Sequence, residues 1–272
     1  MTISAHDVDF ISQVVRARSA IVLDHSKEYL IESRLMTLAR ERGDCSIQDV
    51  VRELRQQPDG PIRDQVVEAM TTNETSFFRD GHPFRALSDS ILPDLLVQRG
   101  RDRSLSVWCA GCSSGQEPYT VAMLIRELIG ADPSWRVRLL ASDISPQMLH
   151  RTTEGIYNQF EVNRGLPAHL LVRYFSRSGI NYRIDPLLRA MIDTKLVNLA
   201  EPFPPMPVVD VMLLRNVLIY FDVQTKKRIL GEVRKVLRPD GYLFLGGAET
   251  TMNIDDGWVR QAVGRATVYR PR

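Results

Sequence analysis

Two carboxylates come shortly after two segments that have the pattern of buried strands. Glu117 follows the apolar run LSVWCAG at 105–111, and Asp143 ends the run VRLLASD at 137–143. In open α/β sheets, ligands bind at the carboxyl ends of the strands. There, Glu117 can accept hydrogen bonds from an ammonium group, and Asp143 can accept from both hydroxyls of a ribose. The pair favours a ligand that carries a positive charge and an adenosine but no phosphate, and S-adenosylmethionine is such a molecule.

Each acid also has an alternative interpretation. Glu117 falls at the start of a predicted helix, where a carboxylate stabilises the helix dipole, and Asp143 could cap the helix that follows it. The stretch Gly111-Cys112-Ser113-Ser114-Gly115 also matches the G-x-S-x-G pattern of a serine hydrolase. Such an enzyme needs a histidine base, and only His150 and His169 follow the serine. A hydrolase is therefore a remote alternative.

The sequence disfavours a dinucleotide site and a metal site in the same loop. Gly111 and Gly115 do not have the G-x-G-x-x-G spacing, and Glu117 would repel a pyrophosphate at the helix N-terminus. Cys109 and Cys112 lack a second pair of ligands or a nearby histidine, so we expect packed cysteines and no metal.

The elements that must position these residues change character along the chain. Residues 1–72 have helical periodicity, and Ser46, the first residue of SIQDVVRELRQQ, is a predicted N-cap. From about residue 105, buried strands alternate with helices, which predicts a parallel α/β sheet, and the last two strands suggest an antiparallel edge. Residues 165–185 interrupt this rhythm around a tight Ser178-Gly179 turn, so we expect a small β-hairpin insertion there.

Composition sets broad limits on function. The chain has 272 residues, a net charge of +2, 44% hydrophobic residues and three cysteines, which is ordinary globular usage. The charge is too near balance to predict a nucleic-acid surface. No signal peptide and no apolar run of membrane-spanning length is present, so we expect a cytoplasmic protein without membrane insertion. We also expect a monomer.

Five motifs together resemble a known family. They are NETSFFRD (73–80), AGCSSGQEPY (110–119), ASDIS (141–145), LVNL (196–199) and LLRNVLIYF (213–221). In this order and spacing they are similar to the chemotaxis receptor methyltransferases of the CheR type, and the resemblance covers essentially the whole chain.

The resemblance implies a class I methyltransferase domain, Rossmann-like and doubly wound, at residues 85–272, with the small insertion at about 165–185. It also implies an all-α domain at 1–72 and a linker at 73–84 that contributes to the active site. The implied reaction is S-adenosylmethionine-dependent O-methylation of glutamate side chains on the cytoplasmic helices of chemotaxis receptors, with S-adenosylhomocysteine as the product. The alternative is an adaptor that binds S-adenosylmethionine and docks on receptor arrays without turnover.

The resemblance also assigns residues by their place in the motifs. Arg79 and Tyr220 would be catalytic, with Tyr220 facing the substrate carboxylate. The set implied for the cofactor is Asn73, Thr75, Arg79, Glu117, Asp143, Asn198, Leu199, Arg215 and Asn216. Phe77 and Phe78 would fix the linker so that Arg79 points at the reacting atoms.

Partners follow from the same resemblance. Arg34, Arg40 and Arg42 would meet the acidic methylation helices of a receptor, although ordinary solvated charges explain them as well. In some members the hairpin insertion binds a receptor C-terminal peptide as an added strand. The turn at 177–180 is shorter here than in those members, which argues against this tether.

Overall fold

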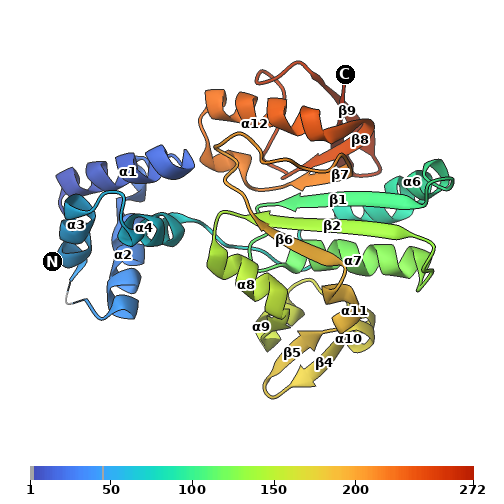
Figure 1. Ribbon diagram of the computed structural model, residues 1–272, viewed down its shortest axis with the longest axis horizontal. Helices are drawn as coiled ribbons and strands as arrows, with labels where there is room; N and C mark the ends of the chain where they lie inside the picture. The colour runs from blue at the N-terminus through green and yellow to red at the C-terminus, as the bar shows by residue number, and fades with distance from the viewer. Residues whose placement is uncertain (1–2, 45) are drawn as a thin grey trace. The chain divides into compact units, whose positions relative to one another are not determined.

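The computed structural model describes residues 3–44 and 46–272 (Figure 1). Contacts within the chain divide it into two compact units. The first unit runs to Thr72 and includes Tyr220–Lys226. The second unit consists of Asn73–Ile219 and Lys227–Arg272.

The first unit is helical, as the periodicity predicts. Its elements before the junction are α1 (Ala5–Ser19), the 3₁₀ turn η1 (His25–Lys27), α2 (Glu28–Arg42), α3 (Ile47–Gln56) and α4 (Pro61–Met70). The predicted cap at Ser46 is confirmed, since its hydroxyl accepts from the Asp49 amide at 3.3 Å. Gly43 ends α2 in the left-handed region, at a φ of 79°, which glycine adopts without steric cost.

The second unit is built on a seven-stranded sheet in the order β6-β2-β1-β7-β8-β10-β9 (Figure 1). The strands are β1 (Ser104–Ala110), β2 (Arg136–Asp143), β6 (Ile192–Leu196), β7 (Val209–Leu214), β8 (Leu237–Leu245), β9 (Trp258–Val263) and β10 (Ala266–Pro271). The first five positions pair in parallel, and β10 pairs antiparallel with both β8 and β9. The predicted doubly wound α/β fold with an antiparallel edge is confirmed.

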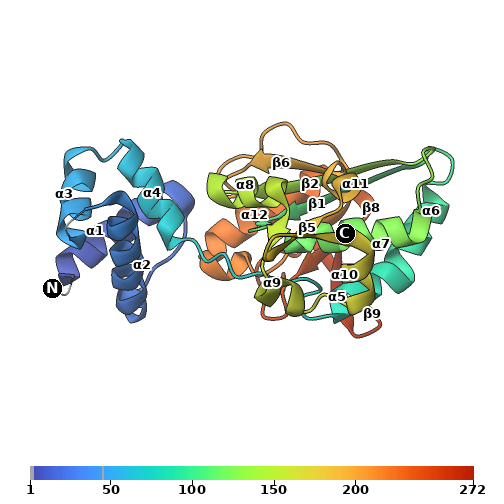
Figure 2. The same ribbon diagram turned by 90° about the horizontal axis from the view of Figure 1, so that it is seen from below.

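Helices and short turns connect these strands. They are α5 (His82–Ala86), the π-helical segment η2 (Leu87–Ile91), α6 (Leu92–Gln98), α7 (Gln116–Ile129), α8 (Pro146–Glu154), α9 (Gln159–Asn163), α10 (Ala168–Tyr174), α11 (Pro186–Arg189), the 3₁₀ turn η3 (Leu218–Tyr220) and α12 (Val223–Val236). Ser145 caps α8 by accepting from the Met148 amide at 3.1 Å, and Pro146 occupies its first turn. In Figure 2, α5 lies close to the β9–β10 end of the sheet, and contacts place it beside β10.

The insertion holds a second, three-stranded sheet in the order β3-β5-β4. It consists of β3 (Ile156–Tyr157), β4 (Phe175–Ser178) and β5 (Asn181–Ile184), all antiparallel. Figure 1 shows the β4–β5 hairpin projecting away from the main sheet, beyond α9 and α10. The predicted hairpin turn is confirmed, because Ser178 pairs with Asn181.

Three local expectations are wrong. Residues 168–174 form α10 rather than part of the hairpin, because Leu170 and Tyr174 follow helical spacing and are both buried. The Pro-Asp-Gly sequence within Arg238–Gly241 is typical of a turn, but the segment lies inside β8, where a register irregularity opposite β7 accommodates it. The short strands β6 and β9 were missed, because each exposes most of its residues at an edge of the sheet.

Candidate active site

The chain reverses its winding direction between β1 and β7, and this point positions the first pair of site residues. From β1 the chain continues through β2 to β6 on one side, and from β7 to β8 on the other. Ligands bind beyond the carboxyl ends of the strands at such a point. Glu117 lies in the first turn of α7 after β1, and Arg215 follows β7 directly. The two side chains meet there, with Arg215 Nη1 donating to Glu117 Oε2 at 2.7 Å.

Arg215 joins the segments around this point. Its side chain is 1% exposed, and its Nη2 donates to Asp80 Oδ2 at 2.7 Å and to the carbonyl of Arg79 at 2.9 Å. Its guanidinium also lies 5.2 Å from the centre of the Phe84 ring, within the range of a cation–π contact. One buried cation therefore ties the 79–84 segment to the ends of β1 and β7.

Burial sets the electrostatics of Glu117. It raises the pKa of Glu117, while the Arg215 guanidinium and, more weakly, the charge of Arg79 act in the opposite direction. The hydrogen bond with Arg215 occupies Oε2 and leaves Oε1 without a partner among the described residues. Glu117 thus keeps one acceptor atom for a cationic group, as its predicted role requires.

Asp143 ends β2 and organises the turns around it. Its side chain is 7% exposed, and its oxygens accept from the Ser113 amide at 2.8 Å and from the Ser145 amide at 3.0 Å. Burial raises the pKa of the Cys112 thiol, and the charges of both Asp143 and Glu117 raise it further. Both acids therefore lie around the same loop after β1, which is what a shared ligand requires.

The segment after β6 continues beside Asp143. The Val197 amide donates to the Asp143 carbonyl at 3.0 Å, which brings Asn198 and Leu199 next to this strand end. Asn198 Oδ1 accepts from the Ala200 amide at 3.0 Å, and Leu199 is 8% exposed. The predicted contact of these two residues with an adenine stays a prediction.

The loop after β1 is glycine-rich because neighbouring side chains leave no room for a Cβ. Gly111 has a φ of 70°, and a Cβ there would lie 2.5 Å from Val217 Cγ2. Ser113 also has a positive φ, of 51°, and its hydroxyl donates to the carbonyl of Asn73 at 2.7 Å. The serine of the G-x-S-x-G match therefore joins the loop to the junction, and its geometry gives no support to the hydrolase alternative.

The junction residues 73–80 pack as the sequence suggests. Phe77 is fully buried and contacts Tyr157 edge-on, with ring centres 5.0 Å apart. Phe78 contacts Phe84 in the same way at 5.7 Å, and its amide donates to Thr120 Oγ1 at 3.2 Å. Both aromatic side chains fix the backbone immediately before Arg79.

Arg79 is the cation of the site that is not committed to an acid. Its Nη1 donates to the Glu74 carbonyl at 2.8 Å, and its guanidinium forms no ion pair with a carboxylate among the described residues. Glu74 is paired with Arg164 instead. Asn73 and Thr75 are half-buried in the same segment, and their contacts with a cofactor remain predictions.

Sequence reasoning missed Glu249, which shapes the loop after β7. Its Oε2 accepts from the amides of Asn216 (2.8 Å) and Gly246 (2.6 Å), and its Oε1 from those of Val217 (2.9 Å) and Ile219 (3.2 Å). These bonds accompany a left-handed Asn216, at a φ of 59°. Glu249 follows β8 at the same edge of the sheet, so the rule that selected the acids after β1 and β2 would also have selected it.

The remaining predicted residues belong to the first unit. Arg34 donates to the carbonyls of Ala69 (3.2 Å) and Thr71 (2.6 Å), and Arg42 pairs with Asp44 and Glu53. Arg34 and Arg42 therefore stabilise the helical unit itself.

Arg40 is exposed, and its side chain has no polar partner within residues 3–44 and 46–272. Tyr220 ends η3, and its carbonyl accepts from the Val22 amide at 2.9 Å. The docking role of the three arginines and the catalytic role of Tyr220 stay predictions.

Comparison with known proteins decides the family. The model of the CheR methyltransferase SAM-binding domain matches residues 73–267, and that of the CheR methyltransferase all-alpha domain matches residues 6–71. The chain belongs to the CheR methyltransferase family. It is 35% identical to chemotaxis protein methyltransferase Cher2 of Pseudomonas putida, over 93% of each chain.

Two further relatives cover most of this CheR methyltransferase. Chemotaxis protein methyltransferase 1 of Pseudomonas aeruginosa is 35% identical over the full length of both chains. The chemotaxis protein methyltransferase of Escherichia coli is 32% identical over 90% of this chain and 84% of its own. The protein is therefore a methyltransferase of chemotaxis, and S-adenosylmethionine is its methyl donor. Within the described residues, no helix combines the length and the apolar character needed to cross a membrane.

The residues of the site fit this donor. Asn216 Oδ1 is buried and has no hydrogen-bond partner among the described residues, and Glu117 Oε1 is also available. Two such acceptors suit the ammonium group of the donor. Asp143, at the end of the neighbouring strand, suits the ribose.

Proposed function

We propose that this CheR methyltransferase transfers methyl groups to glutamate side chains on the cytoplasmic helices of chemotaxis receptors, giving methyl esters for sensory adaptation. The relatives named above are chemotaxis protein methyltransferases, which supports a chemotaxis protein as the substrate. The choice of a carboxylate as the acceptor rests on the site itself.

The observation that carries the proposal is the state of Arg79. The guanidinium of Arg215 donates to both Glu117 and the carbonyl of Arg79, so Arg79 lies near the acid assigned to the donor. Arg79 has no carboxylate partner of its own among the residues the structure describes, and its Nη1 donates to the backbone carbonyl of Glu74. A guanidinium in this state is a binding group for an incoming carboxylate.

A carboxylate acceptor also explains why no general base is needed. The reference pKa of glutamate is about 4.3, so at neutral pH the acceptor is already an anion. The bound donor supplies a methyl group on a positively charged sulfur. As the new C–O bond forms and the C–S bond breaks, the two charges cancel and no proton moves. The chain must align the reactants and exclude water, and positioning can supply about 7–11 kcal/mol.

The residues around the loop after β7 have distinct tasks in this scheme. Arg79 orients the acceptor carboxylate, and the hydroxyl of Tyr220 would bond one of its oxygens and leave the other to attack. Arg215 holds Glu117 and the junction together. No N/D-P-P-Y motif follows β7, where the sequence is RNVLIY, in contrast to methyltransferases that act on amino groups.

The test is transfer of labelled methyl from S-adenosylmethionine to a purified cytoplasmic fragment of a chemotaxis receptor. We expect a label that mild base removes, as for a methyl ester, and its loss when the receptor glutamates are replaced by alanine. Tyr220→Phe should lower kcat more than it weakens S-adenosylhomocysteine binding. Binding of the receptor and the donor without any transfer would support the adaptor alternative instead.

The receptor tether suggested for some family members finds little room here. The outer strand β4 has four residues, and the hairpin turn is closed by the Ser178–Asn181 pair. A peptide added as a strand would have only that short edge to pair with.

A further inference from the structure

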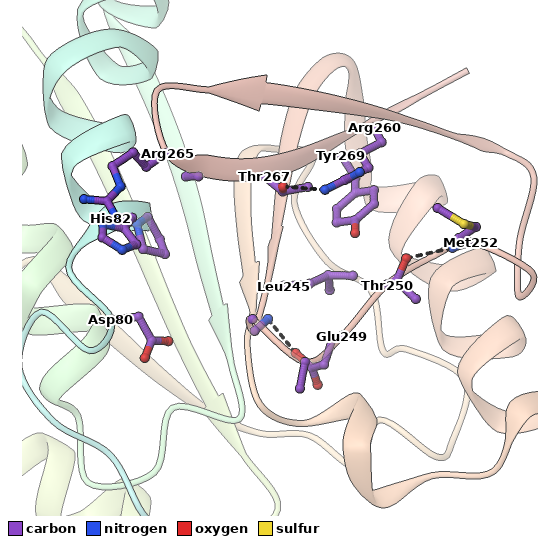
Figure 3. Close-up of a pocket in the computed structure, with 15 residues that line it drawn as sticks. Asp80, His82, Leu245, Glu249, Thr250, Met252, Arg260, Arg265, Thr267 and Tyr269 are labelled. Carbon is purple, nitrogen blue, oxygen red and sulfur yellow. Dashed lines mark hydrogen bonds between the residues drawn. The ribbon is translucent and has the colours of Figure 1, made fainter.

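A groove of about 520 Å³ opens beside the Asp80–Arg215 ion pair, within the second unit (Figure 3). It is formed by the start of α5, the segment after β8 and the β9–β10 hairpin. The residues that determine its chemistry are Asp80, His82, Glu249, Arg260, Arg265 and Tyr269. The groove lies at the carboxyl edge of the sheet, because β10 starts beside the end of β8.

Both acids that line the groove are already bonded. Asp80 is paired with Arg215 at 2.7 Å. The carboxylate of Glu249 accepts from four backbone amides. Neither carboxylate is therefore paired with Arg260 or Arg265 among the described residues.

The donors of the groove, in contrast, lack acidic partners. Arg265 is exposed and forms no side-chain hydrogen bond or ion pair in the described part of the chain. Arg260 is also exposed, and the bond it makes is to the hydroxyl of Thr267 at 3.2 Å. The buried Nδ1 of His82 has no hydrogen-bond partner there either. The net unbalanced charge of the groove is positive.

The two arginines are separated along the groove. Figure 3 shows Arg265 on the side of His82, and Arg260 beyond Tyr269, on the side of Met252. The groove is also lined by the apolar side chains of Leu245, Met252 and Ala266. Two cations separated along a groove with apolar lining match carboxylates spaced along an amphipathic polypeptide better than they match one compact anion.

We propose that this groove binds acidic residues that flank the accepting glutamate in the polypeptide substrate, with Arg260 and Arg265 pairing with their carboxylates. The inference rests on the proposed function for the identity of the substrate. The placement of the groove does not depend on that identity. The Asp80–Arg215 ion pair joins the groove to the site whatever the substrate is. A substrate strand or helix in the groove would lie next to the residues that hold Glu117.

A binding experiment tests the groove without requiring turnover. The probe is a fluorescein-labelled alanine-rich helical peptide with glutamates spaced to share one face, added to the full chain in S-adenosylhomocysteine. The Arg260→Gln/Arg265→Gln double variant should bind it about three- to tenfold more weakly, the range for the loss of two exposed ion pairs. The effect should shrink at high salt.

The matched control carries the same change elsewhere. Arg136→Gln/Arg138→Gln removes two exposed arginines from the opposite, amino end of β2, and should leave peptide binding within twofold of wild type. A peptide with glutamine in place of glutamate should lose the difference between the variants.

Three results would overturn the inference. They are equal binding of the peptide to the wild type and the Arg260/Arg265 variant, an equal loss in the control, and saturable binding of inorganic phosphate at these arginines without binding of the peptide. With a receptor fragment as substrate, the variant should raise KM by a similar factor and leave kcat within twofold. Absence of any methyl transfer would count against the proposed function, while the peptide-binding result would still decide the groove.

Discussion

Replacing Glu249 with glutamine should loosen the loop after β7 and weaken cofactor binding. The carboxylate accepts four amide hydrogen bonds, two on each oxygen, at 2.6–3.2 Å. A glutamine keeps one acceptor oxygen and places an NH₂ group against the other two amides. The substitution thus removes two bonds and also sets donors against donors.

The structure gives the size of the effect. A hydrogen bond to a charged group is worth about 1.5–3 kcal/mol, and the lower value applies because Glu249 is only half-buried. Two bonds then amount to about 3 kcal/mol. Asn216 holds a left-handed conformation, which asparagine adopts more readily than most residues but less readily than glycine, so the loop should relax once those bonds are lost. Since about 1.4 kcal/mol is a factor of ten, we expect S-adenosylhomocysteine to bind at least tenfold more weakly.

Calorimetric titration with S-adenosylhomocysteine and thermal unfolding measure the two consequences. Glu249→Gln should weaken binding and lower Tm by several degrees, and Glu249→Ala, which removes all four bonds, should do more. Asp256→Asn is the control, because Asp256 is an exposed acid in the same connection to β9. If Glu249→Gln keeps an affinity and a Tm equal to those of Asp256→Asn, the carboxylate does not hold the loop and the reasoning fails.

Three other substitutions test separate parts of the site and the fold. Burial raises the pKa of Glu117 above its ordinary 4.5, so the folded wild type should lose stability as pH rises above about 4.5 and this carboxyl ionises. Glu117→Gln lacks the carboxyl, so its free energy of unfolding should fall less over the same rise in pH; parallel curves would contradict this. Asp143→Asn should weaken S-adenosylhomocysteine binding about tenfold by calorimetry, whereas unchanged affinity would remove Asp143 from the cofactor site. The Asp210 side chain is 1% exposed and pairs with Arg99 at 2.7 Å. Asp210→Ala should lower the free energy of unfolding in urea by about 3–5 kcal/mol; a loss below about 1 kcal/mol would show that the pair contributes little.

The fold and the two acids of the site could be predicted because both depend on local pattern. Buried strands followed by helices show directly in runs such as 105–111 and 137–143, and a residue at the end of such a run must lie at the ligand edge. The edge strands β6 and β9 could not be recognised, because most of their residues are exposed and neither has the run of buried apolar residues that marks a central strand.

Long-range contacts account for the rest of what was missed. The position of Glu249 after β8 could have been selected by the same rule, but its partners could not: three of the four amides that it binds lie about 30 residues or more away. The commitment of Arg34 and Arg42 to the helical unit also depends on contacts made elsewhere in the chain. The sequence shows where an arginine is, but not whether its guanidinium already forms an ion pair with a carboxylate.

The burial of Phe77 limits how the small sheet can change in evolution or in engineering. The ring packs against Tyr157 and Phe175, and a Cβ on Gly165 would lie 2.2 Å from the Phe77 carbonyl. The base of this insertion thus packs against the chain that leads to Arg79. At the tip, in contrast, a Cβ added to Gly179 would meet nothing within 4 Å. Relatives or designed chimaeras can therefore lengthen the tip to acquire a new recognition loop, but a deletion of the whole insertion should expose an aromatic ring and displace the arginine.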